Sequence, residues 1–218
     1  MFPNDILAFV FSFVYVGGII YACKYLRDRG YDLHKLRETT HMLMGVWPLV
    51  WLLFETMFAA FMVTVIITLF LIFAPKSIRR VYSGGEEKHY GLIIYSATFM
   101  CITCLYWMSP IGAAAIFTLA FSDGMAGYVG KHYGGHKFRV PWGKTKSIEG
   151  SLAFFLMSII SIILAYSVFA TLPCLTLVII YALILTITEA ISPPHSDNFT
   201  IPITSILLLE YLPYLLCP

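Results

Sequence analysis

The sequence predicts an all-α, polytopic integral membrane helical bundle of about seven or eight transmembrane helices, several of them paired in short hairpins. Of the 218 residues, 59% are hydrophobic and only 12% are charged, whereas a soluble domain carries about 25% charged residues. The apolar residues form continuous runs without strand-like alternation. In lipid, such runs satisfy the hydrogen bonds of their backbone by forming helices. We therefore expect a single integral membrane domain over residues 1–218.

Continuous apolar runs supply the candidate membrane segments. They cover, approximately, residues 6–26, 42–73, 92–121, 151–170, 172–188 and 201–216. A span needs about 20 residues, so the second and third runs are too long for one helix and slightly short for two. The first run has no basic residues before it and no small-residue cleavage site after it, so we expect no signal peptide.

The positions of the basic residues decide how the long runs fold. All 14 Lys and Arg fall in three loops between the runs, at residues 24–37, 76–88 and 131–146. If each long run is a hairpin, all three loops face the cytoplasm, as the positive-inside rule requires. We expect the hairpins to turn at Glu55 and at Ser109-Pro110, and Pro173 to break the next pair of helices.

The cysteines predict no special chemistry. Cys101 and Cys104 form a CxxC pair without a second pair of ligands in reach, so we expect them to pack between helices. The five cysteines are scattered through apolar segments, and an odd number argues against a disulfide framework.

A carboxylate and several glycines lie together near the end of the third run. If residues 110–130 form one helix, Asp123, Gly127 and Gly130 share a face at i, i+4 and i+7. A stripe of small residues also packs helices closely in lipid. That alternative does not account for Asp123, because a carboxylate near the bilayer is costly and indicates a functional site. We predict that Asp123 holds Mg²⁺ together with substrate phosphates.

The third basic loop leads directly into a helix. Its basic residues are Lys131, Lys137, Arg139, Lys144 and Lys146. These charges could serve only as cytoplasmic anchors. However, Glu149 and Gly150 mark a helix start, which is a ready anion site, and lysine pairs with phosphate as a point charge. Glu149 either caps this helix or joins Asp123 on the metal.

Polar residues return after the fifth run. Asp197 or Asn198 could simply cap the last helix. Glu189 is less easily explained, because the negative end of a helix dipole disfavours a carboxylate. We therefore expect a compensating cation or hydrogen bond at Glu189.

The first basic loop ends with Arg37 and His41 at the entrance to a helix. Arg37 could be an ordinary positive-inside anchor. Alternatively, its guanidinium could bind a phosphate through two parallel hydrogen bonds.

These segments together resemble the membrane lipid-alcohol kinases that include dolichol kinase, phytol kinase and CTP-dependent diacylglycerol kinase. The matching motifs are Asp123-x-x-Ala126-x-x-x-Gly130, Lys146-Ser147-x-Glu149-Gly150-Ser151, Glu189, and Asp197-Asn198-x-x-Ile201-Pro202. Arg37 and His41 resemble the family's early Arg-Lys-x-x-His element, except that Glu38 stands where the family usually has lysine. The resemblance covers approximately residues 37–202.

The resemblance implies that the γ-phosphate of CTP is transferred to the hydroxyl of a membrane lipid alcohol, with Mg²⁺, at the cytoplasmic face. The alcohol could be phytol, a polyprenol or dolichol, or diacylglycerol, and no nucleic-acid partner is expected. Asp123 and Glu149 are the expected metal ligands, and Asp123, Glu149 and Asp197 the expected catalytic carboxylates. The expected nucleotide and phosphate contacts are Arg37, Lys131, Lys144, Lys146, Gly127, Gly130, Gly150 and Asn198, with His41 and Glu189 in support.

Two other functions remain as alternatives. A phosphatidate cytidylyltransferase also uses CTP, Mg²⁺ and a lipid, but the chain lacks the late Lys-Asp and Pro-Gly-His-Gly-Gly segment of those enzymes. A transporter or scaffold would place charges near the membrane midplane, often in repeated halves. Here the charges gather on one face and no repeat is visible.

Overall fold

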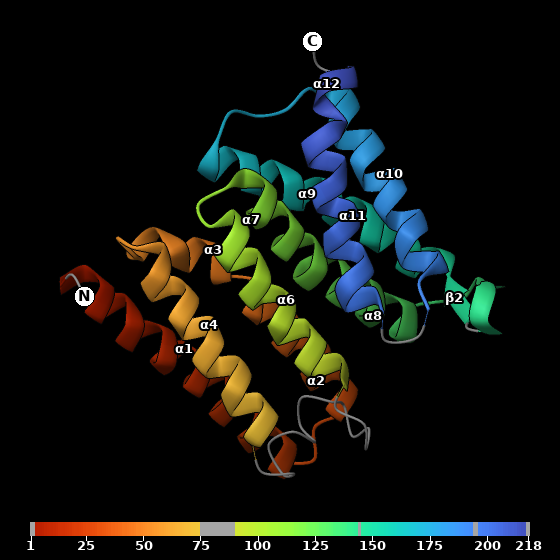
Figure 1. The fold of residues 1–218 in the computed structure, drawn as a ribbon. Helices are drawn as coiled ribbons and strands as arrows, with labels where there is room; N and C mark the ends of the chain where they lie inside the picture. Colours follow the sequence, from red (N-terminus) through yellow and green to blue (C-terminus); the bar gives the residue numbers. More distant parts are fainter. Residues whose placement is uncertain (1–2, 75–89, 144, 194–195, 217–218) are drawn as a thin grey trace. The chain divides into compact units, whose positions relative to one another are not determined.

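The computed structural model describes residues 3–74, 90–143, 145–193 and 196–216, which are almost entirely helical (Figure 1). The all-α fold that the sequence predicts is therefore confirmed. The chain divides into two compact units, Met1–Trp107 and Met108–Pro218. Each unit is described by itself below. That the two act as a single domain stays a prediction.

The first unit contains helices from the first two apolar runs, from the first basic loop and from the start of the third apolar run. Its elements are α1 (Pro3–Asp28), α2 (Leu33–Met44), α3 (Trp47–Val50), the 3₁₀ turn η1 (Trp51–Leu53), α4 (Met57–Phe73) and α6 (Tyr90–Tyr106). Helix α4 packs against α6 and α1, and α1 also contacts α2. Asp32 caps α2, because its side chain accepts a hydrogen bond from the His34 amide at 2.7 Å.

The predicted break at Glu55 is confirmed, and a buried carboxylate holds it. Asp5, fully buried near the start of α1, accepts hydrogen bonds from the amides of Glu55 (2.8 Å) and Thr56 (3.2 Å) and from the Thr56 hydroxyl (2.8 Å). Thr56 in turn caps α4 by accepting from the Ala59 amide at 3.3 Å. Three donors compensate the burial of Asp5 and fix the start of α1 to the break.

The second unit carries most of the predicted motifs. Its elements are α7 (Pro110–Phe117), a π-helical turn labelled η2 (Thr118–Ser122), α8 (Asp123–His132), β1 (Lys137–Arg139), the 3₁₀ turn η3 (Pro141–Gly143), β2 (Thr145–Ser147), α9 (Ile148–Phe169), α10 (Leu175–Ile191), α11 (Asp197–Tyr211) and α12 (Pro213–Leu216). Ser109 caps α7 and Pro110 opens it, as predicted. The break at Pro173 is likewise confirmed between α9 and α10.

Helix α7 is the centre of the second unit. It contacts α9 and α11, and residues 112–117 are all buried. Its small residues, Gly112 and Ala113 to Ala115, allow the neighbouring helices to approach closely. In the turn that follows α7, the Thr118 hydroxyl is hydrogen-bonded to the Tyr181 hydroxyl (2.7 Å), which is also hydrogen-bonded to the Ser205 hydroxyl (2.8 Å). The buried polar groups of α10, α11 and the π-helical turn thus satisfy one another.

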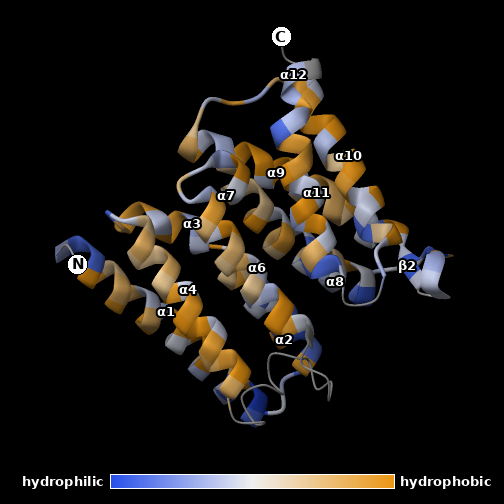
Figure 2. Ribbon diagram, viewed as in Figure 1, coloured by the Kyte–Doolittle hydropathy of each residue, from blue (hydrophilic) through white to orange (hydrophobic). Residues whose placement is uncertain are grey.

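Three helical segments within the described residues are long and apolar enough to cross a membrane: Pro3–Asp28, Pro110–His132 and Ile148–Phe169. Shorter apolar helices accompany them at Met57–Phe73, Gly91–Tyr106 and Leu175–Ile191. Figure 2 shows these helices as mostly hydrophobic, with hydrophilic residues gathered at element ends and around α8 and β2. The protein is thus an all-α membrane bundle.

Two local features differ from the sequence expectations. Residues 110–130 are not one regular α-helix, because the π-helical turn Thr118–Ser122 interrupts them. The third basic loop contains a two-stranded antiparallel sheet, β1 with β2. The cysteines also differ from the expectation that they form no disulfide framework, because Cys174 is disulfide-bonded. Cys101 and Cys104 are free thiols, and Cys101 is exposed rather than packed between helices.

Candidate functional site

The predicted motifs of the second unit meet where α8 and α9 pack together. A Cβ atom on Gly150 would lie 3.0 Å from the Ala126 carbonyl oxygen and 3.1 Å from the Gly130 Cα atom. A Cβ on Gly130 would lie 3.1 Å from the Ser147 Oγ atom. Gly130 and Gly150 therefore permit the close contact of two helices, which is the packing alternative considered for these glycines. A contact of either residue with nucleotide stays a prediction.

The β-hairpin before α9 orients the lysine of the second motif. Phe138 of β1 pairs with Lys146 of β2, and the connection passes through Trp142 and Gly143, both with a left-handed backbone (φ 71° and 72°). Trp142 Nε1 donates a hydrogen bond to the carbonyl of Ile191, the last residue of α10, at 3.1 Å. This bond holds the hairpin against the end of α10.

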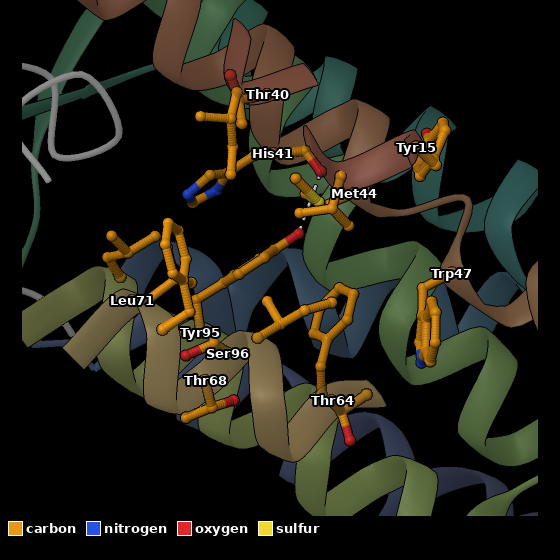
Figure 3. Close-up of a pocket in the computed structure, with 16 residues that line it drawn as sticks. Tyr15, Thr40, His41, Met44, Trp47, Thr64, Thr68, Leu71, Tyr95 and Ser96 are labelled. Carbon is orange, nitrogen blue, oxygen red and sulfur yellow. Dashed lines mark hydrogen bonds between the residues drawn. The ribbon is translucent and has the colours of Figure 1, made fainter. Parts of the chain in front are cut away.

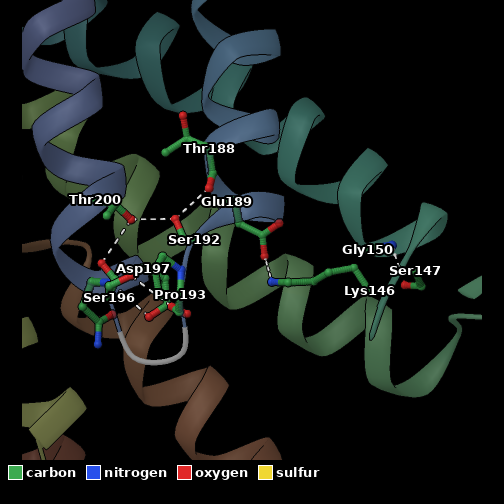
Figure 4. A network of polar contacts seen from close by, with 11 residues as sticks. Lys146, Ser147, Gly150, Thr188, Glu189, Ser192, Pro193, Ser196, Asp197 and Thr200 are labelled. Atoms are coloured by element: carbon green, nitrogen blue, oxygen red, sulfur yellow. Dashed lines mark hydrogen bonds and ion pairs between the residues drawn. The ribbon is translucent and has the colours of Figure 1, made fainter. Parts of the chain in front are cut away.

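Lys146 is the cation that compensates Glu189. Its Nζ atom forms an ion pair with Glu189 Oε1, joining β2 to α10 (Figure 4). The Glu189 side chain is only 3% exposed and that of Lys146 is 23% exposed, so the pair is largely shielded from water. The compensating cation expected at Glu189 is confirmed.

Three carboxylates act on the Lys146 ammonium. Burial lowers the pKa of Lys146, but the attraction of Glu189, then of Asp123 and Asp197, outweighs burial and raises this pKa above its ordinary value. Lys146 is therefore protonated throughout the physiological range. Lys146 therefore contacts Glu189 directly and is influenced electrostatically by Asp123 and Asp197, residues that come from four different elements.

Asp123 begins α8 directly after the π-helical turn. It is half-buried and lies in the first turn, where the positive end of the helix dipole favours a carboxylate. Ser122, the last residue of the π-helical turn, accepts a hydrogen bond from the Ser158 hydroxyl of α9 at 3.2 Å. Turns of this kind occur often at functional sites.

The segment before α11 is tied to the end of α10 by hydroxyl groups. The Ser192 and Thr200 hydroxyls lie 2.7 Å apart and are hydrogen-bonded, and the Ser196 hydroxyl donates to the Pro193 carbonyl at 3.0 Å. Ser196 is the N-cap of α11 and makes no side-chain capping bond. Asp197 instead accepts from the Asn198 amide at 3.1 Å within the first turn, so neither residue occupies the capping position considered for them.

Glu149 is hydrogen-bonded to a histidine. Its Oε1 atom lies 2.7 Å from His136 Nδ1 and accepts the His136 amide at 3.1 Å. Ser147, not Glu149, caps α9, because its hydroxyl accepts from the Gly150 amide at 3.1 Å. A metal-binding or catalytic role of Glu149 stays a prediction.

The remaining predicted contacts are not residues of the Lys146 cluster. Lys131 is exposed at the end of α8. Arg37 and His41 belong to α2 in the first unit, where His41 is buried and stacks on Tyr95 with ring centroids 4.3 Å apart. Lys144 lies outside the described residues. Phosphate binding by these residues stays a prediction.

Sequence reasoning missed the residues that position the cluster. Trp142 donates to Ile191, 49 residues away, and Ser192 bonds Thr200, while His136 bonds Glu149 beside the cluster. Of these, only Trp142 gave a signal, as an aromatic residue between two turn-forming residues.

A complete metal cage is not preformed at the cluster. Among the described residues, no three His, Cys, Asp or Glu side chains lie together as potential ligands of one ion. Mg²⁺ typically needs only one or two carboxylates, with water and substrate phosphates completing the coordination. Mg²⁺ binding by Asp123 therefore stays a prediction.

Comparison with known proteins gives a consistent result. The chain is 36% identical to a probable phytol kinase 3, chloroplastic, of Glycine max, over 61% of this chain and 44% of that protein. It is 28% identical to farnesol kinase, chloroplastic, of Arabidopsis thaliana, over 95% of this chain and 76% of that protein. A probable phytol kinase 2, chloroplastic, of Oryza sativa subsp. japonica is 28% identical, over 84% of this chain and 68% of that protein.

No family model and no solved structure matches the chain. The match to the Glycine max protein covers less than half of that relative's length, whereas the match to farnesol kinase covers nearly the whole of this chain. The resemblance to membrane lipid-alcohol kinases that the motifs predict is confirmed by these relatives.

Proposed function

We propose that this protein is a multi-pass membrane kinase that transfers the γ-phosphate of CTP to the hydroxyl of an isoprenoid alcohol such as phytol or farnesol. The observation that carries the proposal is the Lys146 cluster, in which one shielded ammonium interacts with Glu189, Asp123 and Asp197. The names of the relatives support the alcohol acceptor and its isoprenoid class. CTP as the donor rests on the motif resemblance.

The cluster suits phosphoryl transfer, which requires positioning and charge neutralisation more than covalent chemistry. Lys146 would attract the phosphates as a point charge, and Glu189 would hold its ammonium in place. Asp123 and Asp197 would hold Mg²⁺, which supplies further positive charge against the phosphates. A carboxylate of the cluster, or Glu149, would accept the proton from the alcohol.

The orientation of the site follows from the basic loops. If all three loops face the cytoplasm, α8, the β-hairpin and the ends of α10 and α11 meet the nucleotide there. The alcohol would arrive from within the bilayer, with its hydroxyl at the membrane surface.

The test is a product assay with purified protein in lipid nanodiscs. The reaction contains Mg²⁺, farnesol or phytol, and CTP labelled either on the γ-phosphate or on the cytosine, with labelled ATP in a parallel reaction. Label from the γ-phosphate in the lipid fraction is expected. Cytosine label with phosphatidate as substrate would show a cytidylyltransferase instead, and no lipid label from folded protein would refute an enzymatic role.

The site assignment is tested with a matched pair of carboxylate variants. Asp123→Asn should lower kcat by at least about a hundredfold, because it removes charge that the metal requires. Asp28→Asn, an exposed carboxylate at the end of α1, should retain full activity. Full activity of a well-folded Asp123→Asn protein would place the site elsewhere.

A further inference from the structure

The first unit contains an apolar cavity enclosed by α1, α2, α4 and α6 (Figure 3). Its empty volume is about 760 Å³, including the part that is open to the surroundings. Aliphatic and aromatic side chains such as Ile67, Leu71 and Phe99 supply most of its lining. A hydrocarbon chain is the chemistry that such a lining accepts.

The cavity is not apolar throughout. Two tyrosines line it, whose hydroxyls donate to the backbone carbonyls of Leu43 and His41, and so do four serine and threonine side chains. Three of them are satisfied by the backbone of their own helices. Thr40 donates to the Leu36 carbonyl at 2.7 Å, Thr64 to Phe61 at 2.7 Å and Ser96 to Ile93 at 3.1 Å. Such bonds are the usual way in which a helix accommodates a hydroxyl.

Thr68 is the exception. Its side chain is 6% exposed, and its Oγ1 atom has no hydrogen-bond partner among the residues that the structure describes. A buried hydroxyl without a partner costs roughly 1–3 kcal/mol. Thr68 is one helical turn from Thr64 on the same face of α4, so the same cavity contains one satisfied and one unsatisfied threonine.

We infer that this cavity binds the isoprenoid alcohol, with the hydrocarbon chain in the apolar lining and the hydroxyl hydrogen-bonded to Thr68 Oγ1. The inference deepens the proposed function, on which its choice of ligand rests. The ligand supplies what the cavity lacks, because an alcohol brings one hydroxyl and a long apolar chain. Thr68 also lies near the end of α4, five residues before Phe73.

The experiment measures binding without turnover. A diazirine-bearing farnesol is cross-linked by light to the full chain in nanodiscs, without nucleotide or Mg²⁺, and the labelled peptides are located by mass spectrometry. Competition by unlabelled farnesol gives the affinity of farnesol for the cavity. Competition by farnesene, which lacks the hydroxyl, gives the affinity of the hydrocarbon chain alone. We expect labelling of α1, α4 or α6.

Four variants test the role of the hydroxyl. Thr68→Val should weaken farnesol binding about threefold to tenfold, the worth of one hydrogen bond, and should not weaken farnesene binding. Thr64→Val is the matched control in the same cavity and should change farnesol binding less than about twofold. Ser161→Ala removes a buried unsatisfied hydroxyl of the second unit and should also be neutral. Thr68→Ser keeps the hydroxyl and should bind as the unmodified protein does.

The outcomes separate this inference from the proposed function. Labelling confined to the second unit, or equal effects of Thr68→Val and Thr64→Val, would overturn the inference even if phosphorylation is observed. Equal affinity for farnesol and farnesene in the unmodified protein would show a general lipid-tail pocket, which also overturns it. Thr68-dependent binding without any phosphate transfer would retain the site and refute the kinase.

Discussion

Replacing Lys146 by methionine should lower the stability of the second unit, because it leaves the Glu189 carboxylate buried without its cation. Breaking a buried ion pair by removing one partner costs about 3–5 kcal/mol. The Lys146 side chain retains 23% exposure, so water reaches part of the pair and we expect about 3 kcal/mol, near the low end of that range. For a chain of this size the melting temperature should fall by about 6–12 °C.

The reciprocal change should be milder. Glu189→Gln leaves an ammonium that water can reach and that Asp123 and Asp197 still attract, so its cost should be about 1 kcal/mol. The double variant should also cost about 1 kcal/mol, far less than the sum of the single changes, because neither charge is then left unpaired. The difference is the coupling energy of the pair.

The assay is thermal unfolding of the four proteins in one detergent, together with phosphate transfer to farnesol. The double variant should recover stability without recovering activity, because Lys146 is also proposed to bind phosphate. Lys137→Met, on exposed β1 of the same hairpin, is the control and should change stability by less than about 0.5 kcal/mol. If Lys146→Met costs no more than Lys137→Met, the pair is not the element that joins β2 to α10.

Three further predictions follow from the packing and the charges. Gly150→Ala should destabilise the protein by about 1–3 kcal/mol, because its methyl group would meet backbone atoms of α8 at 3.0 Å and 3.1 Å. The control Gly17→Ala has nothing within 4 Å of the added methyl group. In the same melting experiment it should be neutral or stabilising by up to about 1 kcal/mol. Asp5→Ala should cost about 2–4 kcal/mol by chemical denaturation, since three donors lose their acceptor, whereas Asp28→Ala should cost less than about 0.5 kcal/mol; equal costs would contradict the role of the buried carboxylate. The pKa of Lys146 is raised above 10.5, so its ion pair should stabilise the fold fully at lower pH and lose this effect as pH rises through the raised value. The difference in melting temperature between the unmodified protein and Lys146→Met should therefore be constant from about pH 6 to about pH 9 and shrink above about pH 11.

The sequence was sufficient for features that depend on local chemistry. Proline and its preceding residue located the breaks at Ser109-Pro110 and Pro173, because proline restricts the backbone in any context. Helix-dipole reasoning also required a partner for Glu189, but no sequence pattern identified Lys146 as that partner.

Features that depend on distant contacts were not predictable. The strands β1 and β2 have three residues each, too short for an alternating pattern to be recognised. The carboxylate of Asp5 gives no local sign that it will meet residues about 50 positions later. The unsatisfied hydroxyl of Thr68 differs from that of Thr64 only in its surroundings, so no sequence pattern distinguishes the two.

The π-helical turn Thr118–Ser122 has a consequence for sequence alignment and for insertion or deletion variants. Such a turn contains one residue more than an α-helical turn, and each residue rotates an α-helix by about 100°. Deleting one residue from this turn would restore a regular α-helical turn and change the direction of Asp123 relative to α7 only slightly, whereas deleting a residue of α7 itself would rotate the residues on either side of the gap by about 100° relative to one another. Single-residue gaps in an alignment of related chains should therefore fall between Phe117 and Asp123 rather than within α7.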